Sequence, residues 1–172
     1  MRYLIQFYSR LVFLQVKPQD CPPSEQLRLF LLVTYFLLSI FNSLAVYDIG
    51  QGAVHTVVDI AVLYLFTHVL LSTRKERILQ TLNAFLGAGI IIGLVHTIFS
   101  YALIEDRSQE SVSETGTLIF FTIVIWLIVV YGHIVRHAAE VSLPAGISIS
   151  LGYTIINAIF ILTVVQALGF QG

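Results

Sequence analysis

The sequence has few charged residues, one cysteine and long stretches without an ionisable side chain. Of its 172 residues, 11% are charged and 57% are hydrophobic, whereas soluble domains have about 25% and about 45–50%. The net charge of −1 excludes the basic excess of a nucleic-acid-binding protein. The apolar content excludes a disordered chain, and one cysteine excludes an internal disulfide. The composition predicts a small polytopic membrane protein of the all-α class.

Five stretches are long and apolar enough to cross a bilayer as helices, which takes about 20 residues at a rise of about 1.5 Å per residue. We expect these spans at about 27–47, 53–71, 78–104, 116–135 and 144–168. Ser24 with Glu25, and Ser142 with Pro144, are start signals for the first and fifth spans. The predicted fold is a bundle of five transmembrane helices over 18–172.

Lysine and arginine are distributed unevenly over the predicted loops. Eight lie on the side of the N-terminus, and only Arg107 lies on the other. Because cytoplasmic loops collect Lys and Arg, we expect a cytoplasmic N-terminus and an external C-terminus. The basic residues expected to contact the cytoplasm or lipid headgroups are Arg2, Arg10, Lys17, Arg74, Lys75 and Arg77.

Residues 1–17 have the pattern of an amphipathic helix. At 100° per residue, one arc of about 100° holds the polar side chains, with apolar side chains opposite; the polar set is Arg2, Gln6, Ser9, Arg10 and Lys17. Such a helix lies in the headgroup plane with its basic edge towards anionic lipid. The alternative is that it simply packs beneath the bundle.

Each predicted span carries a polar residue in its outer half or near its middle. An ionisable group near the membrane centre costs roughly 2.5–3.5 kcal/mol on insertion scales, so it invites a functional hypothesis. We expect Asp59 and His96 to be able to meet as an ion pair or a proton-accepting couple. The alternative is a structural network of hydrogen bonds between helices. The candidate cluster comprises Asn42, His55, Asp59, His96, Thr122 and Asn157.

Two stripes of small residues predict close helix packing. Gly89 and Gly93 lie on the face of the third span that also carries His96, which favours a protein-facing His96. Ser148 and Gly152 form a weaker stripe on the fifth span. Such stripes indicate packing inside the monomer more often than dimerisation.

The histidines raise the question of haem. His55 and His96 lie at one predicted depth, and His68 and His133 at another, as two haems between two helices would require. However, His55 and His68 are 13 residues apart, which separates them by about 140° around a helix and disfavours this arrangement. The sequence predicts no cofactor, no metal site and no catalytic residue, since the common catalytic and metal-binding motifs are absent.

The chain resembles the Yip family of small five-span membrane proteins. The similarity lies in an N-terminal segment reaching Lys17-Pro18-Gln19-Asp20, five closely connected spans and Leu151-Gly152-Tyr153-Thr154 in the last span. The resemblance implies a compact protein of the bacterial inner membrane. Eukaryotic members bind small GTPases, but the Asp-Leu-Tyr-Gly-Pro type of motif is absent here, so no GTPase-binding residue is carried over.

Three hypotheses about function follow. The leading one is a non-enzymatic inner-membrane protein that acts by association, as a scaffold, assembly factor or accessory subunit. Its partners would be the lipid bilayer and another membrane protein or a second copy, and no nucleic acid. The second is a small proton- or cation-coupled transporter or channel centred on Asp59 and His96. The third is a b-type cytochrome subunit.

Overall fold

The computed structural model describes residues 2–44, 48–103 and 114–169, and all regular structure in these ranges is helical. Five of its helices are long and apolar enough to cross a membrane, which confirms the all-α bundle. In chain order the helices are α1 (Arg2–Val12), η1 (Pro18–Asp20), α2 (Glu25–Ser43), α3 (Ile49–Leu70), η2 (Lys75–Arg77), α4 (Ile78–Leu103), α5 (Glu114–Ala139) and α6 (Leu143–Ala167).

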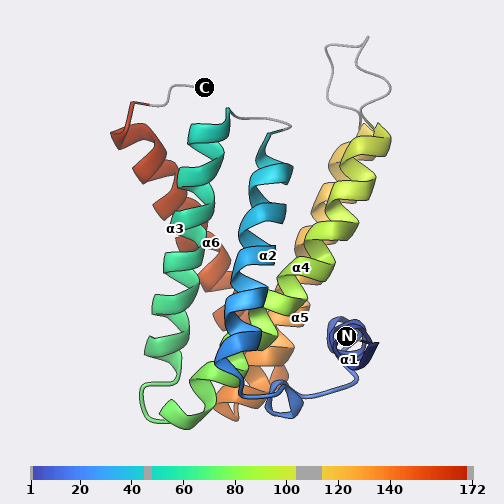
Figure 1. Cartoon of the computed structure of the whole chain (residues 1–172), viewed down its shortest axis with the longest axis vertical. Coiled ribbons are helices and arrows are strands. Elements are labelled where there is room, and N and C mark those ends of the chain that lie inside the picture. The colour runs from blue at the N-terminus through green and yellow to red at the C-terminus, as the bar shows by residue number, and fades with distance from the viewer. Residues whose placement is uncertain (1, 45–47, 104–113, 170–172) are drawn as a thin grey trace.

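The five long helices run up and down, and α1 lies across them, so that it is seen end-on in Figure 1. We call the end that holds η1, η2 and 140–142 the basal end, and the end where α3 begins and α6 ends the far end. Helix α4 packs against α1, α2, α3 and α5. Its residues 81–88 are all buried, so α4 is the centre of the bundle.

Side-chain caps explain where three helices begin. The hydroxyl of Ser24 accepts from the Leu27 amide at 3.2 Å, and that of Ser142 accepts from the Ala145 amide at 3.4 Å, as the start signals predicted. Helix α3 begins at Ile49, four residues before the predicted span, because the Asp48 carboxylate accepts from the Gln51 amide at 2.8 Å. Hydropathy alone does not predict a helix start that depends on such a cap.

Two helices end at a non-glycine residue with left-handed backbone. Leu14 has φ 62° just after α1, and Glu140 has φ 58° just after α5. The Gln15 amide donates to the Arg10 carbonyl and the Val141 amide to the Arg136 carbonyl, which is the closing bond of a Schellman motif. Helix α1 therefore stops well before residue 17, and α5 continues past the predicted end at 135. Residues 45–47, at the end of the first predicted span, lie outside the described ranges.

Helices α5 and α6 cross at two glycines near the basal end. A Cβ atom at Gly146 would lie 2.4 Å from the carbonyl oxygen of Gly132, and one at Gly132 would lie 2.8 Å from the Cα of Ile147. Both close contacts are with backbone, which cannot rotate away. The crossing therefore requires the absence of a side chain at these two positions.

Helix α1 is docked on the bundle by its apolar face. Phe7, Tyr8, Leu11 and Val12 are buried, and the ring of Tyr8 lies over Gly87 of α4. The polar edge of α1 points outward, with Arg2, Gln6 and Arg10 all exposed. Of the two interpretations of this segment, packing against the bundle is therefore observed, and the exposed basic edge still faces the surroundings.

Candidate functional site

A carboxylate lies between three membrane-spanning helices. Asp59 of α3 accepts a hydrogen bond from the Tyr35 hydroxyl of α2 at 2.6 Å and another from the Asn157 amide of α6 at 2.7 Å. Each carboxylate oxygen takes one of these bonds. Both donors are neutral, so the site binds the carboxylate by hydrogen bonds from uncharged groups.

Glycine and aromatic residues make room for this site. A Cβ atom at Gly89 would lie 2.7 Å from the ring of Tyr35 and 3.1 Å from the hydroxyl of Tyr131. Tyr131 and Tyr153 are both buried, with their ring centroids 6.1 Å apart. Gly89 thus has the packing role that the sequence predicted, and its specific effect is to let Tyr35 and Tyr131 approach α4.

A second polar contact joins α2 to α4 nearer the far end. The Thr97 hydroxyl donates to the Asn42 side-chain oxygen at 2.6 Å, and the Asn42 amide donates to the Gly93 carbonyl at 3.4 Å. Leu38 packs against Gly93, where a Cβ atom would come within 3.2 Å. Gly93 therefore also packs within the monomer, as predicted.

A cavity of about 220 Å³ lies between α2, α4 and α5. Tyr35 and Asn42 line it, together with Tyr131 and His96, whose ring is 6.2 Å from that of Phe120. Tyr35 is therefore shared, because its side chain borders the cavity while its hydroxyl binds Asp59. The cavity is a mainly apolar space with a few polar side chains, and it lies beside the half-buried carboxylate.

The structure divides the predicted polar cluster. Asp59 and Asn157 form one contact and Asn42 belongs to another, while His96 borders the cavity. The hydrogen bonds described for Asp59 come from Tyr35 of α2 and Asn157 of α6, and the expected Asp59–His96 couple stays a prediction.

The remaining members of the predicted set are His55 and Thr122. His55 is half-buried one turn before Asp59 on α3. Thr122 is exposed, and its hydroxyl donates to the Leu118 carbonyl of its own helix at 2.8 Å. The sequence survey did not include Tyr35, because it counted acids, imidazoles, amides and Thr but not the phenol hydroxyl, which is also a donor.

The two histidines proposed for an inner haem lie in different surroundings. His68 is exposed on α3, with Nδ1 2.8 Å from the Tyr64 carbonyl. His133 is buried on α5, with Nε2 2.9 Å from the Val16 carbonyl and its ring 4.6 Å from that of His137. Ligation by His133 through Nε2 would require this bond to be lost. No group of three His, Cys, Asp or Glu side chains suited to a metal occurs among the described residues.

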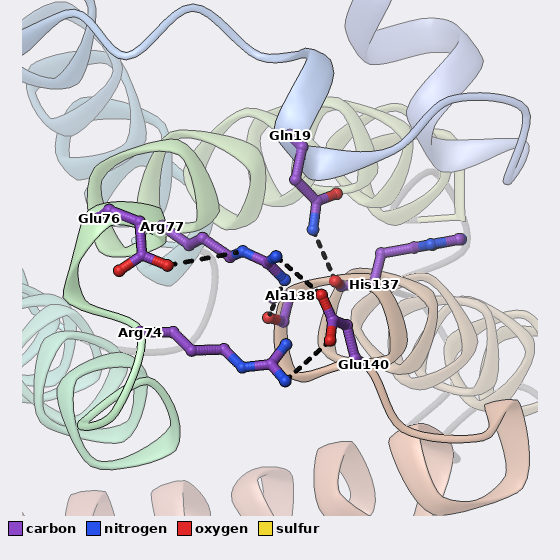
Figure 2. A network of polar contacts seen from close by, with 7 residues as sticks. All are labelled: Gln19, Arg74, Glu76, Arg77, His137, Ala138 and Glu140. Atoms are coloured by element: carbon purple, nitrogen blue, oxygen red, sulfur yellow. Dashed lines mark hydrogen bonds and ion pairs between the residues drawn. The ribbon is translucent and has the colours of Figure 1, made fainter.

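At the basal end, one glutamate joins two loops (Figure 2). Glu140, just after α5, binds Arg74 at 2.8 Å and Arg77 at 2.7 Å, and Arg77 also donates to the Ala138 carbonyl at 3.2 Å. Hydrogen bonds from Arg77 and Arg74 hold the pKa of the Glu140 carboxyl below its ordinary value. Two of the basic residues expected to contact lipid or cytoplasm are thus engaged within the chain, and Lys75 between them is exposed.

The segment between α1 and α2 is held to the basal end by amide side chains. Gln19 donates to the His137 carbonyl at 2.6 Å (Figure 2), and Gln80 donates to the carbonyls of Gln19 and Cys21 at 3.1 and 3.2 Å. Asn83 of α4 donates to the carbonyls of Pro22 and Ser24. The backbone carbonyls of this extended segment therefore accept hydrogen bonds from side chains of α4, because the segment has few backbone partners of its own.

Cys21 is buried beneath α1, and its sulfur lies 3.4 Å from the hydroxyl of Tyr8. Burial raises the pKa of the Cys21 thiol to about 11, although the bond to Tyr8 opposes this shift. Burial likewise raises the pKa of Tyr8. Both groups are therefore held in their neutral forms.

The stripe on α6 is a correction to the sequence analysis. A Cβ atom at Gly152 would meet nothing within 4 Å, and Ser148 is exposed, its hydroxyl donating to the Pro144 carbonyl of its own helix. The expectation that these residues pack inside the monomer is wrong, because this face of α6 is turned away from the other helices.

Comparisons with protein-family models, with curated proteins and with solved structures find no match for this chain. Fold and site together define its class, a multi-pass α-helical membrane protein with a hydrogen-bonded carboxylate between its helices.

Proposed function

We propose that the protein acts by association within the bacterial inner membrane, as a scaffold, assembly factor or accessory subunit related to the Yip family. In this proposal the basal end faces the cytoplasm, because eight of the nine Lys and Arg residues belong to that side. The partner is a transmembrane helix of another membrane protein or of a second copy.

The observation that carries this proposal is the outward face of α6. Gly152 has open space where a side chain would be, whereas Gly132 and Gly146 are in close contact with neighbouring backbone. Gly152 therefore has no packing role within the described chain. In membranes, small residues at helix surfaces let a second backbone approach closely.

The residues around Gly152 have the spacing of a helix-packing seam. Intervals of four, three, four and three residues connect Ser148, Gly152, Ile155, Ile159 and Leu162. Apart from the half-buried Gly152, all are exposed. Alternating steps of three and four residues keep one face towards a partner helix over several turns. We call these five residues the α6 seam.

Photo-crosslinking tests this association. In a Cys21→Ser background, Gly152→Cys carries a benzophenone maleimide on the α6 seam, and Phe160→Cys is the control because Phe160 is exposed on α6 but off the seam. After illumination of native membranes, we expect a protein adduct from position 152 and not from 160. Mass spectrometry of the adduct then identifies a second copy or another protein. Equal labelling at both positions, or lipid adducts alone, would contradict the proposal.

A second candidate, proton- or cation-coupled transport, is favoured by the surroundings of Asp59. The Asn157 side-chain oxygen is buried without a partner among the described residues, although its amide binds Asp59. Such an atom, together with a carboxylate and a neighbouring cavity, is suited to a transient proton or cation.

Asp59→Asn separates the two candidate functions, because asparagine keeps a hydrogen-bonding side chain but cannot ionise. In liposomes, a transporter variant would lose proton or cation flux while remaining folded. An associating protein would keep its seam-dependent adduct. Flux equal in wild type and variant would rule out Asp59-centred transport.

A further inference from the structure

An apolar groove of about 210 Å³ lies where α1 crosses α2 and α4. Leu4 and Tyr8 of α1 form one end, Phe30 and Thr34 of α2 one wall, and Gly87 to Leu94 of α4 the other. The Thr34 hydroxyl is turned to its own helix, where it donates to the Phe30 carbonyl at 2.8 Å. The groove therefore presents a carbon-lined surface.

The groove runs from α1 towards the middle of the bundle. Helices α2 and α4 both leave the basal end in the same direction, and Gly87 and Leu94 are about 10 Å apart along α4 at 1.5 Å per residue. Helix α1 packs against α4 and lies beside the basal half of the bundle (Figure 1). In a bilayer, the groove therefore points from the interface into the hydrocarbon, as a lipid acyl chain does.

A shallow hollow on α1 adjoins the groove. It is lined by Ile5, Gln6, Ser9 and Arg10, and Ile5 belongs to both spaces. Arg10 is exposed and forms no ion pair with any residue in the described ranges. Its guanidinium, with the hydroxyl of Ser9 and the amide of Gln6, offers hydrogen-bond donors without a carboxylate beside them.

We propose that the groove and the hollow together bind one anionic phospholipid, with an acyl chain between α1, α2 and α4 and the phosphate at Arg10. The groove is bordered by three helices of the same chain, and its size suits an extended hydrocarbon chain rather than a helix, whose axis needs about 8–10 Å of separation. The basic edge of α1 favours a negative headgroup over a zwitterionic one.

Native mass spectrometry of the full chain tests this site. Delipidated protein in detergent is titrated with phosphatidylglycerol or with phosphatidylcholine, and the apparent Kd of the first bound lipid is compared. Thr34→Phe fills the groove, and Val33→Phe is its control on the exposed side of the same helix. Arg10→Gln removes the positive charge that is proposed to contact the headgroup, and Arg2→Gln is its control outside the hollow.

We expect wild type to prefer phosphatidylglycerol by about fivefold, the worth of one basic residue near a headgroup with a net negative charge. Arg10→Gln abolishes this preference. Thr34→Phe weakens the binding of both lipids about tenfold, as expected if two methylene groups of the acyl chain are excluded from the groove. The two controls bind like wild type. Leu94→Phe, at the other end of the groove, repeats the test should circular dichroism show that Thr34→Phe is misfolded. Equal affinity for the two lipids, or unchanged binding after the groove is filled, overturns the proposal.

Discussion

At the scale of single residues, Asp59 depends on two neutral donors from other helices. The bonds from Tyr35 and Asn157 satisfy the carboxylate and at the same time satisfy a phenol and an amide that are largely removed from water. Leaving a buried polar group without its partner costs about 1–3 kcal/mol. The carboxylate is therefore a structural acceptor whatever else it does.

Replacing Asp59 tests this dependence. We expect Asp59→Leu to lower the free energy of unfolding by about 1–3 kcal/mol, because it removes the acceptor for both donors. Asp59→Asn keeps a side-chain oxygen as an acceptor, so we expect a smaller loss of unfolding free energy. Unfolding in an SDS titration, followed by circular dichroism, measures both. Thr122→Ala is the control, since Thr122 is exposed and bonds only within its own turn. Equal losses in Asp59→Asn and Asp59→Leu would contradict this explanation.

The Cys21 thiol gives a prediction about pH. Its pKa is raised from 9.0 to about 11 by burial, and only the thiolate reacts with maleimide. At pH 8 we expect alkylation to be at least about 100-fold slower in the folded than in the unfolded protein, the ratio of the thiolate fractions. Because the unfolded chain loses this proton first, the contribution of Cys21 to stability is present below pH 9 and declines towards pH 11. Equal alkylation rates in the two states would contradict the buried position.

At the scale of elements, the faces of α6 differ in what they tolerate. Gly146 faces the backbone of α5, whereas Gly152 faces open space. The same small residue therefore has a packing role at one position and none within the described chain at the other, although the two lie on one helix.

Alanine substitutions separate these roles. Gly146→Ala forces a Cβ atom against the Gly132 carbonyl, and we expect a loss of about 1–3 kcal/mol. Gly152→Ala has no such contact and is expected to leave stability unchanged or raise it by up to about 1 kcal/mol, the helix preference of alanine over glycine. Thermal unfolding in detergent compares the two, and a destabilised Gly152→Ala monomer would show that this face is packed.

At the scale of the whole molecule, α1 and the segment after it act as a strap across α4 and α5. The Trp126 indole donates to the Val12 carbonyl at 3.0 Å, His133 contacts the Val16 carbonyl, and Gln80 and Asn83 hold the following turn. These contacts connect residues more than 55 positions apart. The N-terminal segment is thus part of the folded unit.

Gly87→Val tests whether this strap docks through Tyr8. A Cβ atom at Gly87 would lie 2.1 Å from the Tyr8 ring, so we expect the ring and α1 to be displaced. Trp126, the only tryptophan, should change its emission, and Cys21 should become open to maleimide. Gly152→Val is the control, because it has open space. Unchanged emission and a protected thiol in Gly87→Val would contradict this docking.

The sequence alone determined the class and the number of helices, because membrane-spanning length and hydropathy are local properties that each stretch carries by itself. It also determined two helix starts, since the Ser24 and Ser142 caps act within one turn. The presence of Asp59 and Asn157 as polar residues within long apolar stretches could likewise be recognised from the sequence, but not their direct contact.

Only the tertiary structure decided which polar groups meet. Tyr35 reaches Asp59 because Gly89 lets its ring approach α4, and Gly152 is left outside because α5 and α6 cross at Gly132 and Gly146 instead. Periodicity specifies a face of each helix, but the rotation of one helix against another is set by the packing of all of them. For that reason the spans follow from the sequence, while the Asp59 contacts and the α6 seam follow from the fold.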